Sequence, residues 1–278
     1  GSEMCIRDSC APDPEENLAM TGVHTSAQQG FSTQAATYAQ GRPDYPRQLT
    51  GWLTDTLRIN AQSTVIDLGA GTGKFTRLLS TLAPSLIAVE PVEAMGAQLS
   101  KLLPDVRLLS GTADAIPLPE ASADALVCAQ AFHWFATEAA LAEIHRVLKP
   151  DGRLGLVWNV RDESVDWVAA ITEIITPYEG DTPRFHTGHW REAFTGGYFS
   201  APQMSCFAYQ HVGSPQEVIM DRFLSVSFIA ALPAAQKATV TEQLRGLINT
   251  HPALRGRDTV AFPYQTQAYV CHRLTEKA

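Results

Sequence analysis

The sequence has few cysteines, no excess of basic residues and no long apolar run. Its five cysteines are widely spaced and form no C-x-x-C pair, so we predict neither a disulfide framework nor a structural zinc site and favour a reducing, cytoplasmic location. The net charge of −8 argues against nucleic acid as a partner, because nucleic-acid binders have a basic face. The apolar runs are too short to span a membrane.

The length of 278 residues predicts one large domain, with or without a smaller addition. We interpret residues 1–25 as a tail without a clear apolar period, in which Gly1-Ser2 resembles a tag-cleavage remnant and residues 3–9 resemble translated adapter sequence. The tail lacks the basic start and long apolar centre of a secretory signal. Residues 26–62 are predicted to form a helical N-terminal cap, broken at two prolines. The catalytic or binding domain is expected to cover residues 63–278.

Short β-rich runs alternate with helical patterns from residue 63 onward. The runs "STVIDL", "SLIAVE", "VRLLSG", "ADALVCA" and "RLGLVWN" are separated by segments with apolar residues at helical spacing. Near-continuous apolar strands that alternate with helices indicate an α/β fold, in which helices cover both faces of a parallel sheet. A helical insertion at about 214–254, between the last two predicted strands, is long enough to form a lid over a pocket.

The loop in "VIDLGAGTGKF", residues 65–75, matches neither of two common nucleotide-binding patterns. A phosphate-binding G-x-x-x-x-G-K-[ST] loop would place its first glycine at Leu68 and its hydroxyl residue at Phe75. The dinucleotide pattern G-x-G-x-x-G fails at its third glycine, whether it is counted from Gly69 or from Gly71. A tight turn between a strand and a helix, without a ligand, is the remaining alternative.

The observed pattern D-x-G-x-G-x-G resembles the first motif of class I S-adenosylmethionine-dependent methyltransferases. This resemblance implies a Rossmann-like, seven-stranded sheet that is mostly parallel, with the last strand antiparallel. It also implies S-adenosyl-L-methionine as the methyl donor and S-adenosyl-L-homocysteine as the product. The residues it assigns to cofactor binding in this loop are Asp67, Gly69, Ala70, Gly71 and Gly73.

Glu90 ends the next predicted strand, where a carboxylate can accept hydrogen bonds from both ribose hydroxyls. A solvated loop acid is the alternative. By resemblance, Pro91 and Met95 pack against adenine, although Met95 is equally compatible with the core.

The segment "GTADAIPLP" resembles the family's adenine-binding G-D-A-E-x-L-P-F segment. Thr112 replaces the usual aspartate, so an aspartate contact to the adenine amine is not carried over. The Ala113 amide remains available, and Asp114 stands at the family's glutamate position or serves as a turn acid.

Two further segments extend the resemblance. "AQAFHWF" follows the fourth predicted strand, and its position implies that Gln130 and Ala131 lie beside the methionine part of the cofactor. "Y-x-x-x-RPDYP" resembles a subgroup that includes relatives of trans-aconitate methyltransferase, in which Tyr38 and Arg42 would cap the cofactor's carboxylate. A helix end packed on the sheet is the alternative for this second segment.

Methyl transfer needs alignment of the acceptor and exclusion of water, and it needs a base only when the acceptor carries a proton. His133 is the candidate catalytic base, and the alternative is a histidine that orients its loop. Trp134, Arg184 and Trp190 are candidate substrate-binding residues. His186 and His189 lack matching partners, so no metal is predicted.

We therefore predict a methyltransferase acting on a small-molecule acceptor with an oxygen or nitrogen nucleophile, a carboxylate among them. The alternatives are a nicotinamide-dependent oxidoreductase on a similar sheet and a non-catalytic cofactor-binding protein. The pattern leaves a monomer and a dimer equally open.

Overall fold

A computed structural model describes residues 42–275 of the chain, so the predicted tail at 1–25 and residues 26–41 of the predicted cap lie outside the described residues. The described part contains one seven-stranded sheet in the order β3-β2-β1-β4-β5-β7-β6. Its strands are β1 Thr64–Leu68, β2 Ser85–Val89, β3 Arg107–Leu109, β4 Ala123–Ala129, β5 Leu148–Arg161, β6 Gln203–Gly213 and β7 Val260–His272.

The first five strands are parallel neighbours, whereas β7 runs antiparallel to both β5 and β6. This arrangement confirms the predicted Rossmann-like fold with its reversed last strand. The helical elements are α3 Gln48–Asp55, α4 Lys74–Ser80, α5 Glu93–Leu102, η1 Phe132–Trp134, α6 Glu138–Val147, α7 Asp166–Ile175, η2 Thr176–Tyr178, η3 His189–Gly196, η4 Gln216–Asp221, α8 Arg222–Leu224, α9 Ser227–Ala230 and α10 Ala234–Thr250.

Alternate residues of a strand point to opposite faces of the sheet, so neighbouring residues of β1 pack against different helices. In β1, Val65 belongs to the apolar cluster that includes residues of α3 and α4. Its neighbour Ile66 belongs to the cluster that includes residues of α6 and η3. Both side chains are fully buried, so burial on both faces explains why the strand is a continuous apolar run.

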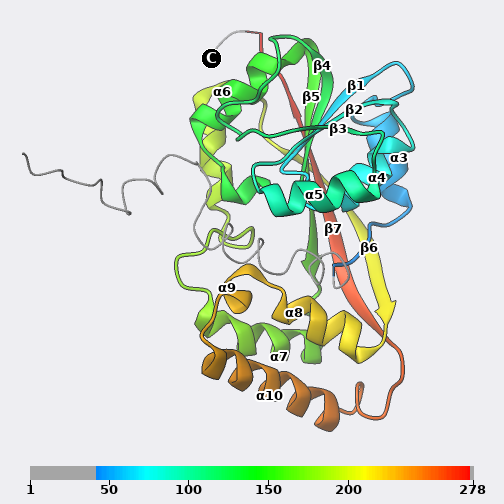
Figure 1. Cartoon of the computed structure of the whole chain (residues 1–278), viewed down its shortest axis with the longest axis vertical. Helices are drawn as coiled ribbons and strands as arrows, with labels where there is room; N and C mark the ends of the chain where they lie inside the picture. Colours follow the sequence, from blue (N-terminus) through cyan, green and yellow to red (C-terminus); the bar gives the residue numbers. More distant parts are fainter. Residues whose placement is uncertain (1–41, 276–278) are drawn as a thin grey trace, which may run out of the picture.

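The helices α7 to α10 form a separate helical lobe, at the bottom of Figure 1, around their own apolar cluster. The elements between β6 and β7 are η4, α8, α9 and α10. However, α7 precedes β6 and joins the same cluster, where Trp167 and Ile171 are packed with Leu244 of α10. The lobe is therefore built from two segments of chain, one on each side of β6.

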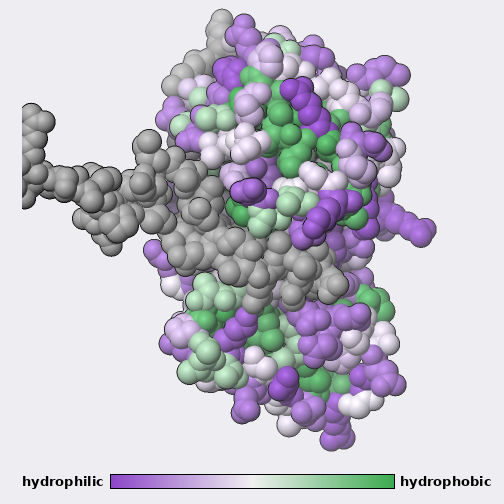
Figure 2. All heavy atoms as spheres, viewed as in Figure 1, coloured by the Kyte–Doolittle hydropathy of each residue, from purple (hydrophilic) through white to green (hydrophobic). Residues whose placement is uncertain are grey.

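On the face shown in Figure 2, hydrophilic and hydrophobic residues both occur over the two halves of the described molecule. The large apolar side chains with the highest exposure are Leu102 of α5 and Met204 and Val212 of β6. None of the helices within residues 42–275 combines the length and apolarity needed to cross a bilayer.

Candidate functional site

The glycine loop after β1 has a backbone that only glycine adopts without strain. Gly69, Gly71 and Gly73 have φ angles of 71°, 59° and 87°, all in the left-handed region. A Cβ atom on Gly69 would lie 2.7 Å from the Cβ of Ala131, and one on Gly73 would lie 2.9 Å from Cγ of Leu99. The loop therefore combines a tight turn with close packing against α5 and the segment that follows β4.

A cavity of about 270 Å³ opens at the carboxyl ends of β1, β2 and β4, which is where open α/β sheets bind ligands. Most residues that the sequence assigns to the cofactor line it. They are Arg42, Asp67, Gly69, Ala70, Gly71, Glu90, Pro91, Met95, Thr112, Ala113, Asp114, Gln130 and Ala131. Gly73 is outside this lining, since it is the N-cap of α4 and packs on Leu99 of α5. Tyr38 lies outside the described residues.

Two buried carboxylates, those of Asp67 and Glu90, line the cavity. Oε2 of Glu90 accepts a hydrogen bond of 2.8 Å from the Gly71 amide, and Oε1 accepts one of 2.9 Å from the Val92 amide. Oδ2 of Asp67 accepts a 2.6 Å hydrogen bond from the Thr76 hydroxyl, while its Oδ1 is buried without a hydrogen-bond partner.

Burial raises the pKa of both carboxyl groups. The pKa of Asp67 rises from 3.8 to about 7, mainly because burial disfavours the charged form, and the nearby Glu90 adds to the increase. The pKa of Glu90 is raised for the same primary reason, although its two backbone hydrogen bonds oppose the shift. Two such groups beside one cavity favour a ligand that brings positive charge or hydrogen-bond donors.

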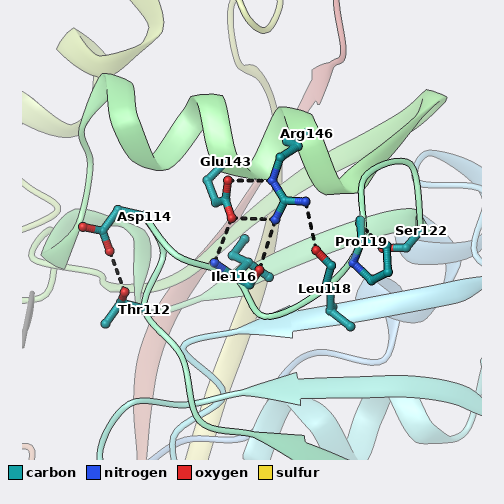
Figure 3. A network of polar contacts seen from close by, with 8 residues as sticks. All are labelled: Thr112, Asp114, Ile116, Leu118, Pro119, Ser122, Glu143 and Arg146. Carbon is teal, nitrogen blue, oxygen red and sulfur yellow. Dashed lines mark hydrogen bonds and ion pairs between the residues drawn. The ribbon is translucent and has the colours of Figure 1, made fainter.

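The loop that follows β3 is fixed by a paired arginine and glutamate of α6 (Figure 3). Arg146 donates to both oxygens of Glu143, at 2.8 and 2.6 Å, and to the carbonyls of Ile116 and Leu118 at 3.1 and 2.9 Å. Glu143 in turn accepts a 3.0 Å hydrogen bond from the Ile116 amide. This network holds the predicted adenine-binding segment on the sheet.

Within that segment, the Thr112 hydroxyl donates a 2.5 Å hydrogen bond to Oδ1 of Asp114. The two side chains thus bind each other at the cavity wall (Figure 3). Gln130 also lines the cavity and has a φ of 60°, which is uncommon for a residue with a side chain. Its amide donates to the Val157 carbonyl at 2.8 Å, so β5 holds this strained turn in place.

His133 lies next to the cavity but outside its lining, since the lining includes Ala131 and Trp134 on either side of it. Its Nδ1 lies 3.1 Å from the indole nitrogen of Trp158, which donates to it. Burial, and then the positive charge of Arg184, lower the pKa of His133 to about 3. A ring with an occupied Nδ1 and so low a pKa is a poor proton acceptor at neutral pH, which disfavours the base role.

The three candidate substrate residues occupy different environments. Trp134 lines the cavity. Trp190, by contrast, is 2% exposed and packs against Phe132, Trp158 and Tyr269, so it is a core residue outside the lining. Arg184 is also outside the lining, and its Nε lies 3.1 Å from Oε1 of Glu179.

The cavity-lining residues that the sequence analysis missed include Tyr45, Lys74, Phe75 and Arg222. Tyr45 and Phe75 meet edge to face at 4.8 Å, and Lys74 donates to the Arg42 carbonyl and lies 3.6 Å from Asp44. Lys74 and Phe75 are the last two residues of "VIDLGAGTGKF", so their position next to the glycine loop was a signal that they line the same cavity. Arg222 lies far along the chain in a segment that reads as a plain amphipathic helix.

Within residues 42–275, no group of three or more His, Cys, Asp and Glu side chains is placed to hold a metal ion.

Comparison with known proteins agrees with this geometry. The family described as "Methyltransferase domain" matches residues 66–156. An uncharacterized methyltransferase-like protein of Schizosaccharomyces pombe is 40% identical over 242 residues, which cover 86% of this chain and 93% of that protein. An uncharacterized methyltransferase of Mycobacterium tuberculosis is 39% identical over 245 residues, which cover 88% and 95%.

Among solved structures, YcgJ from Bacillus subtilis has the same fold, with a TM-score of 0.53 at 20% identity over 83% of this chain and 100% of that chain. The chain belongs to the class I S-adenosylmethionine-dependent methyltransferases. The names of these relatives do not bear on trans-aconitate methyltransferase, so the assignment to that subgroup stays a prediction.

Proposed function

We propose that the cavity binds S-adenosyl-L-methionine and that the protein transfers its methyl group to a small-molecule acceptor with an oxygen or nitrogen nucleophile. The observation that supports this most directly is the 2.8 Å hydrogen bond from the Gly71 amide to Glu90. In dinucleotide and ATP sites, the amides of the glycine loop are left for phosphate. Here that amide is already used by a carboxylate whose negative charge opposes phosphate.

The residues of the cavity fit this cofactor. The unpartnered Oδ1 of Asp67 can accept a hydrogen bond from an ammonium group, and the free lone pairs of Glu90 can accept bonds from ribose hydroxyls. Pro91, Val92 and Met95 supply an apolar wall of the kind that packs against an adenine ring. When bound, S-adenosylmethionine supplies an activated methyl group on a positively charged sulfur.

The chain's own contribution is to orient the reactants and to exclude water. The glycine loop and the turn at Gln130 fix the backbone around the cavity. Trp134 and Phe135 line the wall after β4, next to the strand end where the resemblance places the transferred methyl group. The membership in a methyltransferase family replaces the nicotinamide-dependent alternative considered from the sequence.

Calorimetry with S-adenosylmethionine, S-adenosylhomocysteine, NADH and ATP tests the cofactor. We expect the first two to bind and the phosphorylated ligands to bind at least tenfold more weakly, about 1.4 kcal/mol. Glu90→Ala should weaken binding by about 1.5–3 kcal/mol, the range for hydrogen bonds to a charged group. Glu93→Gln, which alters an exposed acid three residues away and outside the cavity, is the matched control.

Comparable affinity for NADH would contradict the proposal. So would unchanged S-adenosylmethionine affinity in a folded Glu90→Ala protein, because Glu90 would then serve only the two backbone amides. Release of S-adenosylhomocysteine in the presence of candidate acceptors measures turnover separately from binding.

A further inference from the structure

Three arginines from separate segments gather inside the helical lobe. Arg161 ends β5, Arg184 lies between η2 and η3, and Arg222 begins α8. The guanidinium carbons of Arg161 and Arg222 lie 5.6 and 5.4 Å from the centre of the same ring, that of Phe223. The guanidinium of Arg184 lies 5.0 Å from the ring of Phe228.

The acids nearby do not balance these charges. Arg184 lies 3.1 Å from Glu179, a mostly buried carboxylate. Arg161 lies 3.6 Å from Glu163, whose side chain is 48% exposed and therefore screened by water. No ion pair involving Arg222 is found within residues 42–275, although this residue is only 9% exposed.

Arg222 also lacks hydrogen-bond partners. Its Nε and Nη1 are buried and have no hydrogen-bond partner. The hydroxyl of Tyr264, a buried residue of β7, also lacks a partner. A buried charge without a partner is costly, and native proteins satisfy nearly all buried polar groups.

The positive charges of the cluster also affect the pKa of Arg184 and of Arg161. Burial lowers the pKa of Arg184 to about 10, with the charges of Arg161 and Arg222 adding to the decrease. The pKa of Arg161 is lowered by burial and then by Arg222. Mutual repulsion of this kind disfavours the fold unless an anion joins the cluster.

Arg222 is the member of the cluster that reaches the cavity wall. It follows η4, a π-helix, and such segments are rare and occur frequently at functional sites. The same cavity is therefore lined by the glycine loop after β1 and by Arg222 of the helical lobe, a cation without an ion-pair partner within residues 42–275.

We propose that Arg222, supported by the charges of Arg161 and Arg184, binds an anionic oxygen group of the methyl acceptor, a carboxylate or a phosphate. The inference rests on the proposed function, since it concerns the second substrate of the same cavity. The planar guanidinium matches both groups because it presents its N–H donors as a fork. A carboxylate acceptor also needs no base, which agrees with the state of His133.

Calorimetry on the complex with S-adenosylhomocysteine tests the proposal with matched pairs of probes. Succinate and its uncharged diamide form the carboxylate arm, and glycerol 3-phosphate and glycerol form the phosphate arm. We expect at least one charged probe to bind and both uncharged probes to fail. Arg222→Gln should weaken that binding by about 10- to 100-fold. Arg245→Gln, an exposed arginine of α10, should leave it unchanged.

The affinity for S-adenosylhomocysteine itself separates this role from a contact with the cofactor's own carboxylate. It should be the same in wild type and in Arg222→Gln. A drop in this affinity, failure of both charged probes to bind wild type, or equal binding by the Arg222→Gln protein would each overturn the proposal. A failure of wild type to bind S-adenosylhomocysteine would instead contradict the proposed function.

Thermal unfolding of the ligand-free protein gives a second measurement. Arg222→Met removes an unpartnered buried charge and keeps most of the side-chain volume, so we expect its Tm to rise. A lower Tm would show that the charge is already balanced within the fold, and it would overturn the proposal independently of the probes.

Discussion

The indole nitrogen of Trp158 donates a hydrogen bond of 3.1 Å to Nδ1 of His133. Because an indole N–H can only donate, the proton of the neutral imidazole lies on Nε2. With a pKa of about 3, the ring is uncharged at any pH at which the enzyme would be assayed. His133 therefore presents a hydrogen-bond donor, and its only acceptor atom is occupied.

We expect His133→Asn to lower kcat by less than about tenfold, below the range of 10²–10⁴ that general-base catalysis contributes. The pH–rate profiles of wild type and variant should run parallel between about pH 5 and pH 9, because no titration of His133 falls in that range. An inflection near neutral pH that disappears in His133→Asn would restore the base role.

Trp158→Phe is the informative control for this prediction. Phenylalanine retains an aromatic ring among Phe185, Trp190 and Tyr269 but removes the indole donor. Without a partner that favours the neutral ring, the pKa of His133 should rise, which NMR titration of the imidazole measures.

The pKa of Asp67 predicts that cofactor binding depends on pH. The group is about half protonated at pH 7 in the ligand-free protein, and a cationic ligand favours the charged form. The affinity for S-adenosylmethionine should therefore rise up to about tenfold per pH unit below pH 7 and level off above it. Calorimetry in buffers of different ionisation enthalpy should detect release of up to one proton, and Asp67→Asn should abolish it.

The same group affects stability in the opposite direction. Its pKa is 3.8 unfolded and about 7 folded, so the folded state binds more protons between these values. Stability of the ligand-free protein should therefore fall as the pH rises from about 4 to 7. Asp105→Asn, at an exposed position outside the cavity, should reproduce neither effect. A pH-independent affinity in wild type would contradict the raised pKa.

Alanine substitutions should distinguish the glycines of the loop. Gly69→Ala combines a left-handed φ with a contact of 2.7 Å to Ala131, and should cost about 2–5 kcal/mol of unfolding free energy. Gly71→Ala meets only Met95, at 3.8 Å, and should cost about 1–2 kcal/mol from φ alone. Urea unfolding measures both.

Gly246→Ala is the control for these two variants. Gly246 lies within α10, and a Cβ there meets nothing within 4 Å, so the substitution should stabilise the protein by about 0.5–1 kcal/mol. Equal costs for Gly69→Ala and Gly71→Ala would show that the contact with Ala131 relaxes freely.

The sheet and the cofactor side of the cavity were predictable because their signals are local. The apolar runs of β1, β2 and β4 stand between turn residues, and Glu90 and the glycine loop lie at strand ends that a parallel sheet brings together. The acceptor side depends on contacts between distant segments. Nothing in the helical pattern around Arg222 shows that a π-helix precedes it or that its charge is buried.

Aromatic residues were ambiguous for a related physical reason. Trp134 and Trp190 each follow a histidine, and a tryptophan suits a core as well as a cavity wall. The difference arises from η3, which carries Trp190 onto Trp158 and Phe132, whereas Trp134 ends η1 at the cavity. Similarly, α7 packs against α10, although β6 separates them in the sequence. The apolar periodicity of each helix does not show which other helix it packs against.

The position of β7 has a consequence for synthesis of the chain. Strand β6 pairs with β7 alone, and Arg153 of β5 pairs with His272 near the end of β7. During synthesis, one edge of β5 and the whole of β6 therefore have no pairing strand until β7 has left the ribosome. Such long-range pairing is slow and leaves strand edges exposed to aggregation in the interval. The parallel strands β1 to β5 can assemble first, so the reversed strand is the step that closes the sheet and completes the cluster around Phe262.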